Sequence, residues 1–263
     1  MDTLQSTCLP GRGVVALRGP DTIGLIQGLV TANVEGLAIG AVTHAALLTP
    51  QGKILSAFFA WRTDDGLLLD VSASGLETLL QRLKLYKLRA AVEIEDASGS
   101  VGSFVGDEGP EEARPDPRLS ALGVRWLGAP APGDTEAYER RRLDLGVPEF
   151  GADYGPGEVF PMDVNLDALS AVDYKKGCFV GQEVVSRMFR KGEVRKRSWI
   201  ATGGAPLASG ASVTADGRPL GTVTSAAGAA GIALIRVDRV AAANGAVEAG
   251  GVPVVLASPS YLP

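Results

Sequence analysis

The first seventy residues are dominated by short, nearly continuous apolar runs, interrupted once by apolar residues at helical spacing. The runs predict strands at 13–19, 41–48, 53–62 and 67–72, and the spacing predicts a short helix at 20–31. Residues 49–52, Thr-Pro-Gln-Gly, suit a tight turn between the second and third strands. The pattern therefore predicts an antiparallel meander.

The next seventy residues favour two longer helices and two more strands. Leucines recur at helical intervals in 76–90, and Ser74 with Glu77 has the spacing of a capping box at the start of this helix. We predict strands at 92–96 and 100–106, followed by a loop at about 107–117 that is rich in proline and acidic residues. Residues 134–146 predict a helix that ends at Gly146.

The last seventy residues differ from the rest. Short apolar runs at 221–227, 231–238 and 252–257 alternate with glycine-rich turns, which is typical of a small β-barrel or sandwich. The chain is therefore predicted to be α+β, with a first region at 1–192 and a C-terminal β-barrel at 193–263. The irregular, Gly- and Pro-rich stretch 147–169 is expected to line or cover a site.

Composition narrows the function classes. The 263 residues are 46% hydrophobic and 21% charged, the balance of a well-cored protein. We see no targeting segment and no apolar run of about 18 residues, so the sequence predicts a cytoplasmic protein without a membrane partner. The net charge of -5 argues against indiscriminate nucleic-acid binding, although a local basic patch stays open.

Cysteine and histidine are scarce. Cys8 and Cys178 are the two cysteines, far apart in sequence, and both are interpreted as free thiols. The single histidine, His44, lies in a strand-like run and is expected to be packed there. With so few candidate ligands and bases, a zinc site and a Ser-His-Asp triad are both disfavoured, and we predict no intrinsic metal.

One cysteine has unusual neighbours. Residues 175–183 read KKGCFVGQE, so Cys178 follows Lys175 and Lys176 and precedes a helix predicted to begin at about Gln182. Cations and a helix N-terminus both favour a thiolate. The flanking Gly177 and Gly181 suggest positive φ or close packing, and Glu183 with Arg187 has the spacing of an i,i+4 ion pair. A buried structural cysteine in a loop-to-helix turn remains the alternative.

The stretch from Lys176 to Arg187 resembles the signature Lys-Gly-Cys-[Phe/Tyr]-x-Gly-Gln-Glu-x-x-x-Arg of the folate-binding YgfZ family, the bacterial relatives of the mitochondrial iron–sulfur assembly factor. Segments 25–34, 46–55, 141–154 and 161–169 also look similar, in the same order. The resemblance makes Cys178 the functional thiol, within a motif that consists of Lys176, Gly177, Cys178, Phe179, Gly181, Gln182, Glu183 and Arg187.

The resemblance also implies a fold and a cofactor. The family shares its fold with the T-protein aminomethyltransferases, which implies a folate-binding region of ferredoxin-like subdomains followed by a small β-barrel. Tetrahydrofolate or a derivative is the implied cofactor. Asp144 stands where relatives typically have a glutamate, whose carboxylate suits bidentate recognition of a pterin. Asn33 and Arg142 are further implied folate contacts.

Catalysis by aminomethyl transfer is disfavoured by two residues. Where the aminomethyltransferases carry paired aspartates, this chain has Ser56 and Ala57, and neither supplies an ionisable group for acid or base chemistry. The leading hypothesis is therefore a folate-binding accessory protein for iron–sulfur cluster assembly or repair, without classical turnover, that supports cluster-dependent enzymes including tRNA-modifying ones. Its expected partners are assembly or client proteins. The alternative is a folate-dependent aminomethyl- or methyltransferase.

A basic cluster surrounds the motif, and several kinds of ligand are compatible with it. Folate glutamates and tRNA phosphates would both be attracted to it, and a solvated face at a domain junction is the third interpretation. Its members are Lys175, Lys176, Arg187, Arg190, Lys191, Arg195, Lys196 and Arg197.

Overall fold

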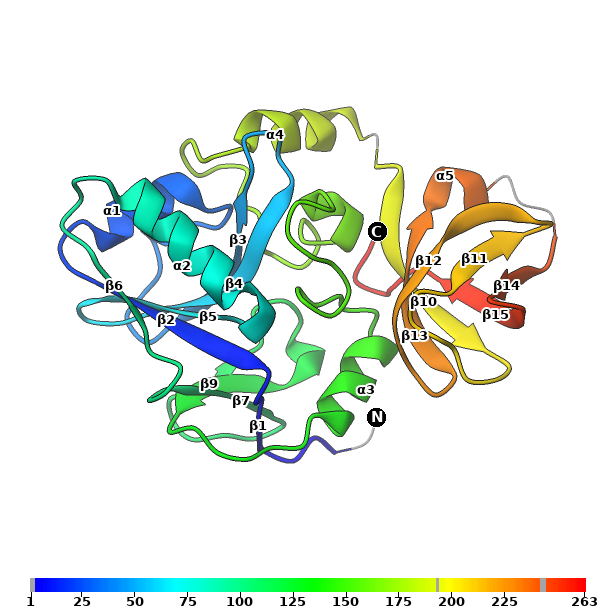
Figure 1. Ribbon diagram of the computed structural model, residues 1–263, viewed down its shortest axis with the longest axis horizontal. Coiled ribbons are helices and arrows are strands. Elements are labelled where there is room, and N and C mark those ends of the chain that lie inside the picture. Colours follow the sequence, from blue (N-terminus) through cyan, green and yellow to red (C-terminus); the bar gives the residue numbers. More distant parts are fainter. Residues whose placement is uncertain (1–2, 193, 242–244) are drawn as a thin grey trace.

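The computed structural model describes residues 3–192, 194–241 and 245–263. Two open sheets, the helices and a long irregular stretch form the larger part of the molecule, and a barrel forms the other part (Figure 1). The predicted boundary between 192 and 193 involves residue 193, which lies outside the described residues. That boundary stays a prediction, although the barrel strands begin at Lys196.

The larger open sheet is the predicted meander closed by the first long strand. Its order is β3-β4-β5-β2-β6, and each neighbouring pair is antiparallel. The register places His44 opposite Phe59 and Phe59 opposite Asp70, so these three side chains share one face. The strands are β2 (Arg12–Arg18), β3 (Val42–Leu48), β4 (Ile54–Arg62), β5 (Gly66–Ser72) and β6 (Glu93–Asp96).

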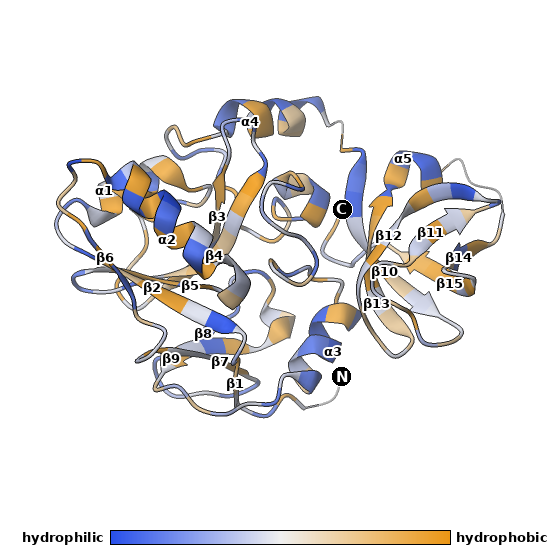
Figure 2. Cartoon of the chain, in the orientation of Figure 1, coloured by the Kyte–Doolittle hydropathy of each residue, from blue (hydrophilic) through white to orange (hydrophobic). Residues whose placement is uncertain are grey.

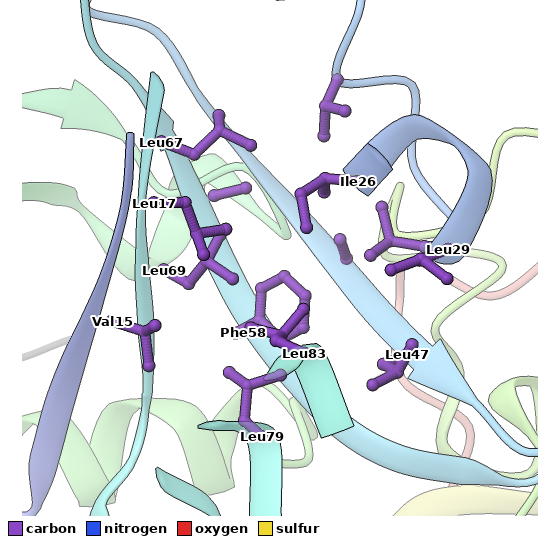
Figure 3. Packing of buried hydrophobic residues seen from close by; sticks show 14 of the residues in the cluster. Val15, Leu17, Ile26, Leu29, Leu47, Phe58, Leu67, Leu69, Leu79 and Leu83 are labelled. Carbon is purple, nitrogen blue, oxygen red and sulfur yellow. The ribbon is translucent and has the colours of Figure 1, made fainter. Parts of the chain in front are cut away.

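One face of this sheet is apolar and is covered by helices α1 (Thr22–Leu29) and α2 (Ala73–Lys87) (Figure 1). Burying a leucine-sized side chain contributes about 1.5–3 kcal/mol, so this face alone fixes both helices on the sheet. Figure 3 shows the side chains that meet there: Val15, Leu17, Ile26, Leu29, Leu47, Phe58, Leu67, Leu69, Leu79 and Leu83.

The start of α2 differs from the prediction. The helix begins at Ala73, so Ser74 lies inside its first turn, and the Ser74 hydroxyl is hydrogen-bonded to the Ser72 hydroxyl at 2.9 Å. No side chain caps the helix, and the predicted capping box of Ser74 and Glu77 is wrong. The reason is tertiary: β5 pairs with β2 up to Ser72 and runs directly into the helix.

A second open sheet lies against the other face of the first. Its order is β1-β7-β9-β8, and the sequence pattern predicted only its central strand β7. The helix α3 (Glu136–Asp144) follows it in the chain. The strands are β1 (Thr7–Cys8), β7 (Gly102–Gly106), β8 (Arg114–Pro115) and β9 (Val124–Gly128).

A buried ionic cluster joins the two sheets. Arg125 and Arg118 both bind the Asp116 carboxylate, with N–O distances of 2.6 and 2.8 Å, and Arg12 binds Glu149 at 2.6 Å. Removing one member of a buried ion pair typically costs about 3–5 kcal/mol, because the remaining charge is left without compensation. The ionic cluster consists of Arg12, Asp70, Asp116, Arg118, Arg125 and Glu149.

Aromatic groups complete this cluster. The Arg125 guanidinium lies 3.9 Å from the centre of the Phe59 ring, on the face of the first sheet opposite the helices. The Tyr138 hydroxyl accepts hydrogen bonds from Arg118 and Arg125 and donates one to Glu149. Burial raises the pKa of a carboxyl, but the guanidinium groups outweigh that effect and hold the pKa of Glu149 well below its usual range.

The C-terminal strands close into the predicted barrel, in the order β10-β13-β12-β11-β14-β15. Gly146 ends α3 as predicted, with φ at +68°, and a side chain there would meet Ile200 and Pro259 of the barrel part. The elements are β10 (Lys196–Gly203), β11 (Ser212–Ala215), β12 (Arg218–Ala227), β13 (Ala230–Arg236), α5 (Val237–Val240), β14 (Val247–Ala249) and β15 (Val252–Ala257).

Polar contacts attach the barrel to the rest. Asp153 accepts a hydrogen bond from Arg142 at 2.6 Å and another from Thr224 of β12 at 2.6 Å. The Asn165 amide donates to the Ser198 carbonyl oxygen at 2.8 Å.

Among the described residues, no helix combines the length and apolar character that crossing a bilayer requires.

The packed position of His44 predicts a pH dependence of stability. Burial, aided by Arg118, lowers the pKa of His44 to about 3. Below pH 6.5 the unfolded chain therefore binds a proton that the folded chain does not, and folding stability falls. Denaturant titrations should show that the native protein loses about 2 kcal/mol more than His44→Leu between pH 7 and pH 5. Equal losses in the two proteins would contradict the buried neutral imidazole.

Candidate functional site

The cysteine motif forms the approach to helix α4 (Gln182–Lys191), which starts at the residue predicted from the sequence. Figure 1 places α4 beside one end of β3 and β4, where the hairpin of these strands turns. A side chain at Gly52 of that hairpin would meet Val184 of α4, and Phe179 is buried in a core cluster that includes Ile54. The motif is therefore packed directly on the large sheet.

The two glycines of the motif have different roles. Gly181 has φ at +80°, and a Cβ atom there would lie 2.6 Å from the carbonyl oxygen of Thr49. Gly177 has no such φ, and a Cβ atom would meet nothing within 4 Å. The expectation of positive φ or close packing is thus correct for Gly181 and wrong for Gly177.

The Lys176 side chain points into the protein. Its ammonium group donates hydrogen bonds to the carbonyl oxygens of Gln27, Val30 and Ala32, at 2.7, 2.6 and 2.8 Å. Burial lowers the pKa of Lys176 to about 8, although Asp173 opposes this effect. The side chain satisfies carbonyl groups at and beyond the C-terminal end of α1, so it fixes the motif loop to that helix.

Cys178 is exposed, whereas Cys8 is buried in β1. The alternative of a buried structural cysteine at position 178 is therefore wrong. Gly177 and Glu183 are also exposed, and Gln182 is half-buried. Among the described residues, no three His, Cys, Asp or Glu side chains are grouped so that they could hold a metal ion. The accessible chemistry of the motif is that of one thiol.

The predicted basic cluster loses two members in the folded chain. Lys176 is buried as described, and Arg197 forms a bidentate ion pair with Asp167, with N–O distances of 2.5 and 2.8 Å. Glu183 and Arg187 form no ion pair with each other, so that prediction is wrong. The exposed remainder, named the basic strip, consists of Lys175, Arg187, Arg190, Lys191, Arg195 and Lys196.

The implied folate residues have unequal surroundings. Asp144 is exposed at the end of α3 and, within the described part of the chain, its carboxylate makes no hydrogen bond or ion pair. Arg142 is buried and bonded to Glu139, Asp153 and Ser225. Asn33 is exposed in the turn after α1, where its side-chain oxygen accepts from Gln27 and Gly36.

These surroundings fit the binding of a pterin only in part. Asp144 has a free carboxylate for it, whereas the guanidinium of Arg142 is already engaged in ion pairs. No hydrogen bond joins Asn33 to either residue. Ser56 and Ala57 are buried, so the positions of the transferase aspartates hold no ionisable group. The roles of all three folate residues stay predictions.

Sequence patterns missed a second region with unusual chemistry. A cavity of about 260 Å³ lies over the ionic cluster and is lined in part by Arg12, Tyr138, Glu139 and Glu149. The signal that could have found the cluster is Asp70, a charged residue in the middle of an otherwise apolar strand. A buried carboxylate requires partners, but the sequence does not show which ones.

Comparison with known proteins places the chain in a family. Residues 195–263 match the model of the CAF17 C-terminal beta-barrel domain. An iron-sulfur cluster assembly factor IBA57, mitochondrial, of Mus musculus is 30% identical, with 91% of this chain and 80% of that protein covered. The IBA57 homolog of Mycosarcoma maydis is 33% identical, with 76% and 59% covered. The chain belongs to the IBA57 family of iron–sulfur cluster assembly factors.

The comparison also bears on fold and location. A glycine cleavage system aminomethyltransferase T from Bartonella henselae has a TM-score of 0.79 over 98% of this chain and 86% of its own, at 14% identity, which confirms the predicted T-protein-like fold. This chain spans 52–59% of the length of four of its fungal IBA57 relatives. The predicted cytoplasmic location is wrong, because the IBA57 relatives are named as mitochondrial proteins. Composition and periodicity describe folding and do not encode a compartment.

The two motif glycines give a matched pair of variants. Gly181→Ala forces an alanine into φ +80° and against the Thr49 carbonyl, so we expect a loss of about 2 kcal/mol in the free energy of unfolding. Gly177→Ala, four residues away, should change it by less than about 0.5 kcal/mol. Urea denaturation measures both. Similar losses in the two variants would show that the motif turn is not held as described.

Proposed function

We propose that this protein is an accessory factor in the assembly or repair of iron–sulfur clusters and that Cys178 is its functional thiol. Membership of the IBA57 family supports the role, because its relatives are named as iron–sulfur cluster assembly factors. The observation that carries the proposal is an exposed thiol on a loop whose neighbours Lys176, Phe179 and Gly181 are each fixed by packing or hydrogen bonds. A mitochondrial place of action, taken from the relatives' names, is part of the proposal.

Cluster chemistry limits what this chain supplies. Iron–sulfur clusters are held mainly by cysteine thiolates, usually four of them. Cys8 is buried in β1, so Cys178 is the thiol that this chain offers at its surface. One thiolate does not enclose a cluster, and the other ligands must come from a partner. The protein therefore acts on a cluster that it shares briefly with an assembly or client protein.

The environment of the thiol suits such a partner. The basic strip consists of Lys175 before α4 and of residues in α4 and the segment after it, all close in sequence to Cys178. None of its members forms an ion pair with another residue that the structure describes. Phe189, which is 51% exposed, lies in α4, and its ring stacks on the ring of Tyr174 with 3.9 Å between the ring centres. Aromatic residues and arginine are enriched in protein–protein interfaces, and exposed cations attract anionic partners.

Folate binding is a second and more specific part of the proposal. The T-protein-like fold and the carboxylate of Asp144, which has no partner among the described residues, support tetrahydrofolate as a bound ligand. Asp144 would recognise the pterin ring, and the ligand would be bound rather than used for group transfer. Kinship with the YgfZ proteins and a benefit to tRNA-modifying enzymes belong to the same proposal. Direct binding of tRNA to the basic strip is the rival use of those residues. No observation favours aminomethyl transfer.

A variant at the thiol tests the central claim. Cys178→Ala should fail to restore a cluster-dependent enzyme in cells that lack this protein, and the activity should match that of cells without any copy. Cys8→Ala is the matched control, because it removes the buried thiol, and it should restore activity. Protein levels must be measured for both. Full restoration by Cys178→Ala would remove the thiol from the mechanism.

Calorimetric titration with tetrahydrofolate tests the folate proposal separately. Asp144→Ala removes the exposed carboxylate and should weaken binding about tenfold or more, the loss expected for a hydrogen bond to a charged group. Glu136→Ala removes another exposed carboxylate from the same helix and should leave the affinity unchanged. Arg142 is unsuitable for this test, because its replacement would break buried ion pairs. Absence of binding to the native protein would contradict the folate proposal.

A further inference from the structure

Two leucines at the end of α2 face solvent. The same helix buries Leu79 and Leu83 completely, yet Leu85 is 61% exposed and Leu88, directly after the helix, is 84% exposed. Figure 2 shows α2 with alternating hydrophobic and hydrophilic bands. Single exposed leucines are ordinary, but two within one turn of a helix end form an apolar tip that the fold does not use.

The backbone of Leu88 is strained. Its φ of 46° and ψ of -109° lie in a region that L side chains rarely adopt. Helices commonly end in a residue of positive φ, but that residue is usually glycine, sometimes asparagine, and the ψ of Leu88 also lies outside the left-handed helical region. The chain keeps a leucine in this conformation although its side chain packs on almost nothing, so the residue does not stabilise the fold through burial.

Four cations surround the two leucines. Arg82, Lys84 and Arg89 are exposed and Lys87 is half-exposed, and none of the four side chains forms an ion pair or hydrogen bond with another described residue. Two lysines in the last turn complement the helix dipole, but that effect accounts for neither Arg89 nor the leucines. The neighbouring acidic residues are Glu93, and Asp21, which accepts a hydrogen bond from the Ala91 amide.

We propose that this tip of α2 binds the surface of an anionic phospholipid bilayer. Leu85 and Leu88 enter the boundary between headgroups and acyl chains, and the four cations lie against lipid phosphates. Clusters of roughly four or more Lys and Arg residues beside apolar side chains are typical of such surfaces. A protein partner would need a far larger area, about 800 Å² on each side, than two leucines provide.

Membrane contact at this tip would leave the motif accessible. Figure 1 shows α2 lying along the sheet face that α1 also covers, whereas α4 sits beside the end of the β3–β4 hairpin. Cys178 precedes α4, so the thiol and the tip belong to different elements of the fold. The inference rests on the α2 residues and does not depend on the function proposed for Cys178.

Leu88→Gly tests the proposal because it should change binding and stability in opposite directions. The test is cosedimentation of the full chain with vesicles of phosphatidylcholine alone or mixed with phosphatidylglycerol. The native protein should bind only the mixed vesicles, and less at high salt. Leu88→Gly should lose most of this binding, while its melting temperature rises by about 2–4 °C, because glycine adopts the left-handed conformation without strain.

Two more variants distinguish binding through the tip from nonspecific binding to vesicles. Leu85→Ala should also weaken vesicle binding, and alanine maintains the helix. Phe189→Ala removes an exposed apolar side chain from α4 and should bind vesicles like the native protein. Binding to neutral vesicles, unchanged binding of Leu88→Gly and Leu85→Ala, or no binding of the native protein to anionic vesicles would each overturn the proposal.

Discussion

Three guanidinium groups and three carboxylates buried between two sheets are the interaction on which the rest of this structure depends. Each charge costs several kcal/mol to remove from water, so every member must be paired, and the pairs fix strands from both sheets in one position. Glu149 belongs both to this cluster and to the irregular stretch that follows α3. Four residues later, Asp153 binds Arg142 and reaches Thr224 of the barrel. One electrostatic arrangement therefore locates three parts of the molecule.

The cysteine loop benefits from this rigid support. It leaves the irregular stretch, is fixed to α1 by the ammonium of Lys176 and turns against the β3–β4 hairpin at Gly181. The thiol of Cys178 is exposed on this loop. A single thiol on a fixed loop suits the proposed role of sharing a cluster with a partner, because it is presented in one geometry but does not enclose a cluster. That combination agrees with an IBA57-type fold in which Ser56 and Ala57 replace the carboxylates of a transferase.

Local patterns predicted much of the fold. The strands of the meander, the leucine-rich helix, the start of α4 at Gln182 and the barrel all follow from periodicity and turn residues, which depend on neighbours in sequence. Two failures share one cause. Ser74 has the spacing of a cap, and Lys176 has the position of a member of the basic cluster, but β5 pairing and the carbonyls near α1 decide what those side chains do. Both effects come from residues that are distant in sequence: Arg12 pairs with Ser72, and Ala32 accepts from Lys176.

The sequence by itself determined most of the element types, the presence of two cysteines in the chain, and the absence of ionisable side chains at positions 56 and 57. Tertiary structure alone decided that Cys178 is exposed, that Lys176 is buried, that Arg197 is paired and that Asp70 has partners in a charged core. The physical reason is the distance along the sequence over which each effect acts. Periodicity and backbone preference act over a few residues, whereas the partner of a charge is chosen by which strands and loops meet, here up to 149 residues apart.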